Sequence, residues 1–145
     1  LFRSRIKMTT LDIGGKKAIT HYRVLKYFDK VSYIECKLET GRTHQIRVHF
    51  KTLGHPLVGD KTYGSNKTNY EPSIGDAIKL LSRQALHAFK LSLIHPCTHE
   101  KMHFSCPLAD DFKLLLDTLN ASIDSIEDKS DDELDSNWEI MYVEE

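Results

Sequence analysis

The chain has 145 residues, which is long enough for one domain with a hydrophobic core but not for two substantial domains. Its hydrophobic content of 40% includes no run near the roughly 18 apolar residues of a membrane span, and no signal-peptide pattern is visible, so we expect no membrane partner. The net charge of −1 is the sum of +10 over residues 1–107 and −11 over residues 108–145. This split suggests a polyanionic partner for the basic residues 1–107. Local solubility explains the split equally well.

Two strand-like runs follow a turn signal at residues 14–17. The first covers residues 18–28 and is rich in β-branched and aromatic side chains, and the second covers residues 31–39 with a less regular alternation. Asp29 and Lys30 lie between them and would form a two-residue hairpin connection, although the usual glycine is missing. We therefore expect an antiparallel pair here.

The next stretch, residues 39–53, has closely spaced basic and hydrogen-bonding side chains between apolar ones. As a helix it would carry an apolar stripe and a neighbouring polar stripe, formed by Ile46, Phe50 and Leu53 and by His44, Arg47 and Lys51. A strand is a rival, since Ile46, Val48 and Phe50 also alternate. We favour the helix, because Leu53 and Gly54 form a good stop signal.

The later elements follow from periodicity and turn residues. We expect a loop over residues 64–75, a short helical turn over 76–81, a strand over 85–94, its hairpin partner over 101–106, and an amphipathic helix through Phe112, Leu115, Leu116 and Leu119. Pro107 and Asp110 would open that helix. Residues 120–145 carry ten acidic side chains against one lysine, which predicts a flexible acidic tail after a domain of residues 1–119.

The cations of residues 42–51 suit an anion site, because the arginine fork pairs with phosphate or carboxylate through two hydrogen bonds. The alternative, which needs no binding function, is a solvated basic face on an amphipathic helix.

The specific residues of this stretch and the one after it favour the anion site. GRTHQIRVH at residues 41–49, followed by LGHPLVGDKTYG at 53–64, closely resembles the long motif of RluA-type RNA pseudouridine synthases. AITHYRVL at 18–25 resembles the tyrosine motif of that family, and RQALHA at 83–88 with His95 and Pro96 resembles its later segment. The resemblance covers about residues 1–119.

The resemblance implies catalytic roles for three residues. Tyr22 matches the tyrosine that packs on the uracil, Arg47 the arginine that pairs with a catalytic aspartate, and Leu86 the apolar residue of the pocket wall. Without the motif, Tyr22 would be a half-buried strand tyrosine and Leu86 an ordinary core residue. No redox step or metal is needed, so we expect no cofactor.

The same motif supplies candidates for RNA contacts. Arg42 and Lys61 would hold phosphates, which fix register without reading sequence. Simple surface solvation is the alternative for Lys61. For His44 and Gln45 we keep structural and RNA-positioning roles open.

One departure from the family pattern concerns its catalytic aspartate, which lies upstream of the tyrosine motif in a His-Arg-Leu-Asp-like stretch. Nothing in residues 1–17 matches that stretch; Asp12 lies too near Tyr22, and Asp60 belongs to the long motif. We therefore expect the C-terminal part of a catalytic domain, inactive alone, with a missing N-terminal half as a possible partner.

The cysteines and histidines are weak signals. Cys36, Cys97 and Cys106 have no metal-type spacing and suggest reduced, mostly buried thiols in a cytoplasmic protein. His95, His99 and His103 are spaced by four, but Pro96 would break a helix that aligned them, so we predict no metal site.

These observations predict an α+β fold, with a mixed, mostly antiparallel sheet and flanking helices. The predicted function is uridine-to-pseudouridine isomerisation in ribosomal large-subunit RNA. The alternative is a non-catalytic basic RNA-binding module derived from that fold.

Overall fold

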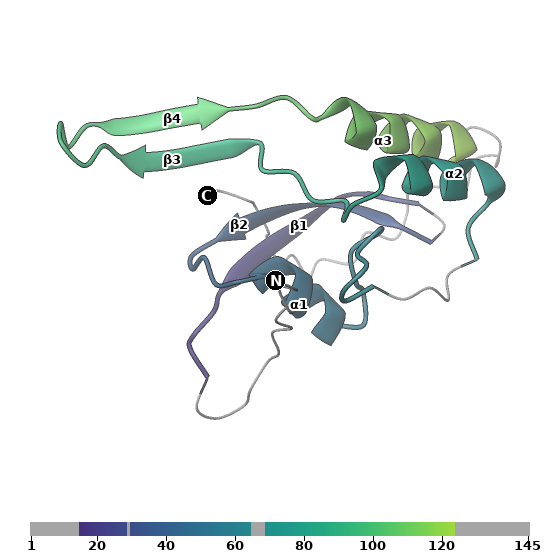
Figure 1. Cartoon of the computed structure of the whole chain (residues 1–145), viewed down its shortest axis with the longest axis horizontal. Helices are drawn as coiled ribbons and strands as arrows, with labels where there is room; N and C mark the ends of the chain where they lie inside the picture. Colours follow the sequence, from purple (N-terminus) through teal and green to yellow (C-terminus); the bar gives the residue numbers. More distant parts are fainter. Residues whose placement is uncertain (1–14, 29, 65–68, 124–145) are drawn as a thin grey trace, which may run out of the picture.

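The computed structural model describes residues 15–28, 30–64 and 69–123. Along the chain the elements are β1 (Thr20–Tyr27), β2 (Ser32–Leu38), α1 (Gln45–Thr52), α2 (Pro72–Leu81), β3 (Lys90–Ile94), β4 (Lys101–Ser105) and α3 (Asp110–Ile123) (Figure 1). The predicted α+β class and the antiparallel pairing are confirmed. In the described part of the chain the strands form two separate two-stranded sheets, β1–β2 and β3–β4, where a single sheet was expected.

The β1–β2 sheet presents two different faces, because side chains alternate along a strand. Ile34, Cys36 and Leu38 of β2 point to one face and pack in an apolar cluster with α1. On the opposite face, the ring of Tyr33 lies 6.3 Å from that of Phe112 in α3. The sheet therefore separates α1 from the part of the chain that contains α3.

Helix α1 resolves the choice between helix and strand in favour of the helix. Ile46 and Phe50 are buried as predicted and form the centre of the first cluster with Cys36. Leu53, however, is 55% exposed at the C-cap, while Val48 is buried. The apolar stripe is therefore displaced from the predicted one, because the helix ends before Leu53 can turn toward the sheet.

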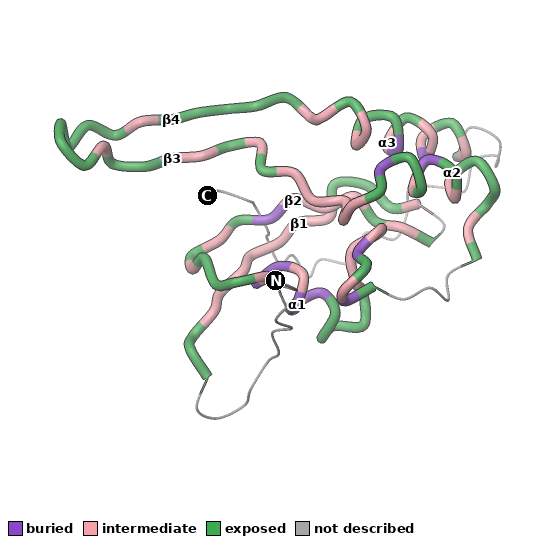
Figure 2. Tube along the Cα trace, viewed as in Figure 1, coloured by how far each residue is buried: buried purple, intermediate pink, exposed green. Residues whose placement is uncertain are grey.

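Helices α2 and α3 pack together around a second apolar cluster (Figure 2). Its buried members are Ala77, Leu81, Leu115 and Leu119. Phe28 and Val31, at the turn end of the β1–β2 sheet, also pack on this cluster. The long β1–β2 hairpin thus contributes to both cores.

Strands β3 and β4 form an arm that projects away from the α2–α3 pair (Figure 1). Among the described helices and strands, β3 contacts only β4 and β4 contacts only β3. Much of the arm is exposed (Figure 2), including Ile94 and Phe104. Among the described residues, the arm is held to the body mainly through the covalent chain at its base.

Two predicted boundaries are wrong. Helix α2 begins at Pro72 rather than at Asp76, because proline is well suited to the first helical turn, and the interior Gly75 was read as part of a loop. Strand β3 begins at Lys90 rather than at Ala85, because local hydrogen bonds occupy the backbone before it: Arg83 Nη1 donates to Leu86 O at 3.0 Å and Leu86 N donates to Gln84 O at 2.8 Å.

The predictions for the connections and the C-terminal part are met in part. Asp29, in the predicted hairpin connection, lies outside the described residues. Helix α3 is confirmed and runs to Ile123, with Asp110 and Asp111 in its first turn, where negative charge is favourable. The first four residues of the predicted acidic tail are therefore helical, and the rest lie outside the described residues.

The thiols correct one expectation. Cys36 is buried, and desolvation together with the charge of Glu35 raises its pKa to about 12. Cys97 and Cys106 are exposed, so the cysteines are not mostly buried. No helix in the described ranges is long and apolar enough to cross a membrane. The cytoplasmic location stays a prediction.

Candidate active site and RNA interface

Gln45 at the start of α1 ties the helix to β1 and to the preceding loop. Its Nε2 donates to Ile19 O at 2.9 Å and to Thr20 Oγ1 at 2.8 Å. Its Oε1 accepts from Thr40 Oγ1 at 2.7 Å and from the Arg42 backbone N–H at 3.0 Å. A glutamine amide has two donor hydrogens and room for two donors at its oxygen, and all four positions are used. An RNA contact through this side chain would therefore have to break one of these bonds.

Arg47 projects from α1 into an ion pair with Asp60. Arg47 Nε donates to Asp60 Oδ2 at 2.7 Å and Nη2 donates to Oδ1 at 2.9 Å, which is the two-bonded geometry of a strong arginine–carboxylate pair. The side chain of Asp60 is fully buried and that of Arg47 is 12% exposed. The guanidinium carbon also lies 5.0 Å from the ring centre of Tyr63. Arg47 is consequently held in one orientation.

Asp60 acts as the structural centre of the loop after α1. Its Oδ1 also accepts the backbone N–H groups of Thr62 at 2.8 Å and Tyr63 at 3.0 Å. Burial by itself would raise the pKa of the carboxyl, but the hydrogen bonds from Arg47, Tyr63 and Thr62 and the charge of Arg47 outweigh it and bring the pKa to about 2. The same pairing raises the pKa of Arg47. Asp60 is therefore a permanently ionised, fully hydrogen-bonded anchor and is unsuited to proton transfer.

The pair uses only one edge of the guanidinium. Arginine has five N–H donors, and the pair with Asp60 engages one on Nε and one on Nη2. Among the described residues, Nη1 of Arg47 has no hydrogen-bond acceptor. Arg47 therefore retains donors for a second anionic group.

Tyr22 and Leu86 lie on one apolar cluster although 64 positions separate them in the sequence. Both pack, partly buried, against Cys36, Ile46 and Phe50. The ring of Tyr22 meets that of Phe50 edge-on, with 5.7 Å between ring centres. Ile46 directly precedes Arg47 on α1. The three residues predicted to be catalytic are thus gathered around one helix, two on its apolar cluster and one on its polar side.

The segment that carries Leu86 is fixed from two sides. Arg83 pairs with Asp111 at the start of α3 through two hydrogen bonds of 2.9 and 2.8 Å, which lower the pKa of that carboxyl. On the other side, Ala85 N donates to Val58 O at 2.8 Å. A Cβ on Gly59, whose φ is +73°, would lie 2.3 Å from Arg83 O, so only glycine permits this approach.

The residues predicted to contact RNA fall into two groups. Arg42 and Lys61 are exposed, and among the described residues Arg42 Nε reaches only the carbonyl of Lys17, at 3.3 Å. His44 has a left-handed backbone, with φ of 56°, and its Nδ1 lies 3.0 Å from the hydroxyl of Tyr63. Arg42 and Lys61 are accessible to a polyanion, whereas His44 and Gln45 are engaged within the protein.

Sequence reasoning missed the structural roles of Asp60, Tyr63 and Arg83. Asp60 was assigned to its loop without a partner, and Arg47 was assigned to a catalytic aspartate instead. The available signal was that Gly59 and Gly64 flank Asp60, a pattern typical of a tight turn organised by a carboxylate. For Arg83 no signal pointed to Asp111, because such a pair depends on the three-dimensional packing of α3.

Comparison with known proteins agrees with the motifs. A sequence family described as RNA pseudouridylate synthase matches residues 3–52, a range that includes Tyr22, Arg42 and Arg47. The chain is 42% identical to ribosomal large subunit pseudouridine synthase D of Neisseria meningitidis serogroup A, over 98% of this chain and 42% of that protein. It is 50% identical to the protein of the same name from Nitrosomonas europaea, over 73% of this chain and 30% of that protein.

A third relative extends the agreement. The protein of that name from Haemophilus influenzae is 45% identical over 81% of this chain and 37% of its own length. The chain thus spans less than half the length of each of these curated relatives.

Proposed function

The chain belongs to the RNA pseudouridine synthase family, and from this premise we propose that it contributes most of an active site that converts uridine to pseudouridine in ribosomal large-subunit RNA. The observation that supports this proposal best is the gathering of Tyr22, Leu86 and Arg47 around α1. The relatives are named for this reaction and this RNA.

The chemistry matches the character of these side chains. The reaction breaks the bond between uracil N1 and ribose C1′, turns the base, and forms a bond from C5 to C1′, after which C5 loses its proton and N1 gains one. The uridine must first leave its stack, which costs a few kcal/mol. An aromatic face at Tyr22 and an apolar wall at Leu86 would compensate by packing on the extruded base.

Arg47 would serve as the positioning cation. Its Nη1 group, which points away from the pair with Asp60, would bind the catalytic carboxylate and keep it ionised and oriented. Because residues 1–17 hold no stretch like that of the family aspartate, we propose that this carboxylate comes from a segment other than those described here.

The test is release of tritium from ribosomal RNA labelled at uridine C5. We expect little release from the 145-residue chain alone, and release when an aspartate-bearing N-terminal segment from one of the relatives is added. In that reconstituted protein, Tyr22→Phe and Arg47→Lys should lower the rate by at least about a hundredfold, the scale of losing one proton-transfer or positioning group. Lys79→Gln on exposed α2 is the matched control and should leave the rate unchanged.

Two outcomes would contradict this proposal. Turnover by the chain alone would show that the aspartate assignment is wrong. RNA binding with no turnover in any reconstitution would favour the alternative, a non-catalytic RNA-binding module, which is consistent with the net charge of +10 over residues 1–107.

A further inference from the structure

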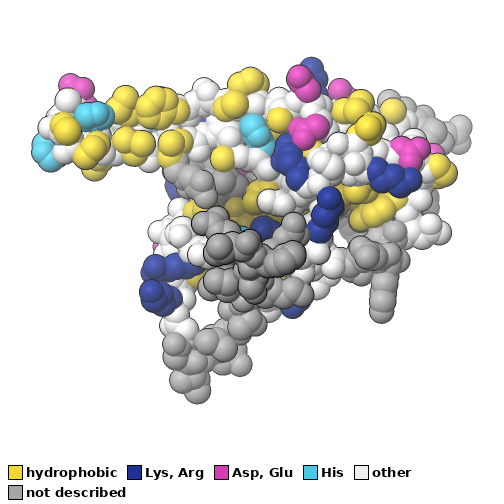
Figure 3. Space-filling view, viewed as in Figure 1, with side chains coloured by type: hydrophobic (Ala, Val, Ile, Leu, Met, Phe, Trp, Pro, Cys, Tyr) yellow, Lys and Arg dark blue, Asp and Glu magenta, His cyan; other side chains and the backbone are white. Residues whose placement is uncertain are grey.

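The arm formed by β3 and β4 has one basic face and one apolar face. The strand register pairs Lys90 with Ser105, Ser92 with His103, and Ile94 with Lys101, so these side chains share one face. The alternate pairs, Leu91 with Phe104 and Leu93 with Met102, share the other. Figure 3 shows hydrophobic side chains gathered along the arm. Such an alternation assigns a different environment to each face.

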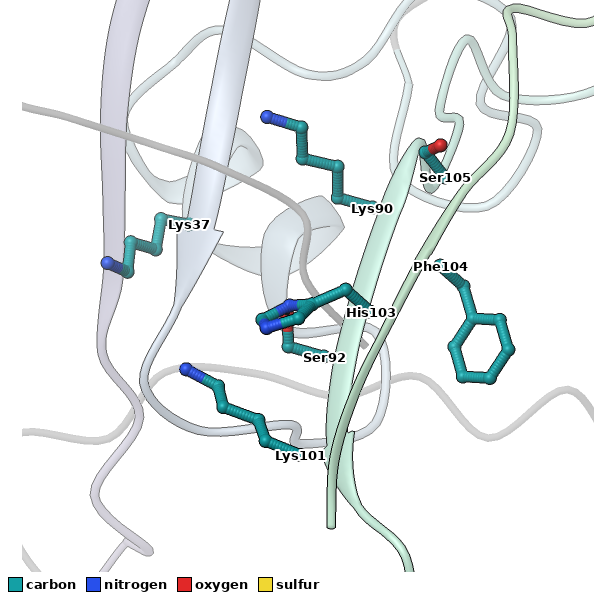
Figure 4. A pocket seen from close by; sticks show the side chains of 7 residues that line it. All are labelled: Lys37, Lys90, Ser92, Lys101, His103, Phe104 and Ser105. Carbon is teal, nitrogen blue, oxygen red and sulfur yellow. The ribbon is translucent and has the colours of Figure 1, made fainter.

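The basic face looks across a hollow toward β2. The hollow has a volume of about 470 Å³, and Lys37 of β2 lines it opposite Lys90, Lys101 and His103 (Figure 4). Ser92 and Ser105 add hydroxyl groups, and no acidic side chain is among the described residues that line it. Phe104 borders the hollow but its ring points away from the lysines (Figure 4). The hollow is therefore cationic and rich in hydrogen-bond donors.

The composition of the hollow suits phosphate groups. Lysine ammonium groups donate three hydrogen bonds each and attract anions as point charges. His103 Nδ1 lies 2.8 Å from Ser92 Oγ, which orients the ring and directs Nε2 away from that contact. The described residues that line the hollow include no carboxylate that could pair with a cationic ligand.

The spacing of the cations distinguishes a polymer from a small anion. Lys90 lies at one end of β3, and Lys101 faces Ile94 at the other end. Four residues of strand span about 13 Å, which is too far for one phosphate to bridge but matches three or four successive phosphates of a nucleic-acid strand. The cations line a track rather than a point site.

We propose that Lys90, Lys101 and His103 on the arm, with Lys37 on β2, form a track that binds the phosphate backbone of an RNA strand at a distance from the reacting uridine. The inference rests on the proposed function, because it assumes an RNA substrate. Lys37 points to the face of β2 opposite Cys36, and Cys36 packs with Tyr22. The track therefore lies across the sheet from the candidate active site and contributes register and affinity without touching the base.

The experiment measures the affinity of the 145-residue chain for a fluorescently labelled 20-nucleotide single-stranded RNA at several salt concentrations. The variant K90Q/K101Q removes two cations from the track, and the matched control K79Q/K113Q removes two exposed lysines from α2 and α3. Each lost phosphate contact lowers the salt slope by about 0.7, so the track variant should lose about 1.4 in slope and about 25-fold in affinity at 0.1 M salt. The control and the charge-preserving variant K90R/K101R should stay within about threefold of the original protein.

The outcomes separate this inference from the proposed function. Unchanged affinity and slope in K90Q/K101Q, with thermal unfolding showing a folded protein, would overturn the track and leave the isomerase proposal intact. If K90Q/K101Q bound a polyglutamate peptide more weakly than the original protein but bound RNA equally well, the hollow would be assigned to an acidic protein segment. That result would overturn the RNA assignment. If the reconstituted protein showed no isomerase activity while K90Q/K101Q still lowered the salt slope of RNA binding, only the proposed function would be contradicted.

Discussion

At the level of single residues, the Arg47–Asp60 pair has the clearest energetic consequence. Asp60 is fully buried and accepts four hydrogen bonds, two of them from Arg47. Removing one member of a buried ion pair leaves the other charge without compensation, which costs roughly 3–5 kcal/mol. Substitution of either Arg47 or Asp60 in the long motif should therefore destabilise the fold.

We expect Asp60→Asn to lower the free energy of unfolding by roughly 3–5 kcal/mol, because the amide no longer compensates the buried guanidinium of Arg47. The matched control is Asp76→Asn, which breaks an exposed pair with Lys79 and should cost less than about 1 kcal/mol. Denaturant unfolding at pH 7 measures both. Similar losses for the two variants would show that Asp60 is not an anchor.

The same pair predicts a pH dependence. The folded-state pKa of Asp60 is about 2, below the ordinary value near 3.9, so its stabilisation is fully present above about pH 4 and is lost as the pH falls toward 2. His49 acts in a higher window. Burial lowers its pKa, so protonation opposes the folded state as the pH falls below about 6.5. Unfolding of Asp60→Asn across pH 2–5 should show less acid dependence than that of the original protein.

At the level of elements, the sequence was informative wherever a local pattern decided the outcome. The periodicities of β1, β2 and α3 placed those elements correctly, and the stop at Leu53 and Gly54 favoured the helix now seen as α1. The start of β3 could not be predicted, because it depends on the side chain of Arg83, which binds both Leu86 O and Asp111. Local patterns do not contain such long-range pairings.

The candidate site follows the same rule. The motif resemblance named Tyr22, Arg47 and Leu86, and the structure brings them to one helix. The resemblance could not show that Gln45 spends all its hydrogen bonds within the protein, because its partners Ile19 and Thr20 are far from it in the sequence.

Helix α2 offers a test with adjacent residues. Leu81 is 2% exposed in the second cluster, whereas Leu80 next to it is 69% exposed. Leu81→Ala should lower the free energy of unfolding by roughly 2–5 kcal/mol through lost burial and the cavity left behind. Leu80→Ala removes the same atoms from an exposed position and should change it by less than about 0.5 kcal/mol. Equal effects would show that α2 does not pack on α3 as described.

For the whole molecule, the two apolar clusters meet at two short segments. Leu57 packs on the first cluster and Val58 on the second, and Leu86 and Ala85 divide in the same way. The hydrogen bond from Ala85 N to Val58 O and the close approach at Gly59 join these segments. The two cores are therefore linked beside the candidate site, and disturbance of either one should reach Leu86.

The arm stands outside both cores, and this predicts uneven protection from hydrogen exchange. Backbone amides of β3 and β4 should exchange at least about tenfold faster than those of α2 and α3, because the arm contacts no other described element. Exchange of the intact chain followed by mass spectrometry measures this difference. Equal protection would mean that the arm is covered by a contact outside the described residues.

The six-residue turn between Ile94 and Lys101 decides which side of the arm carries charge. His95 N donates to Glu100 O and His99 N donates to His95 O, each at 2.9 Å, and His99 adopts a φ of 57°. These bonds fix the length of the turn and hence the alignment of the two strands. One additional residue that slid β4 by one position would send Met102 and Phe104 into the hollow and turn Lys101 and His103 out of it. A single inserted codon would thus turn two of the four basic side chains of the hollow away from it while every lysine remained in the gene product.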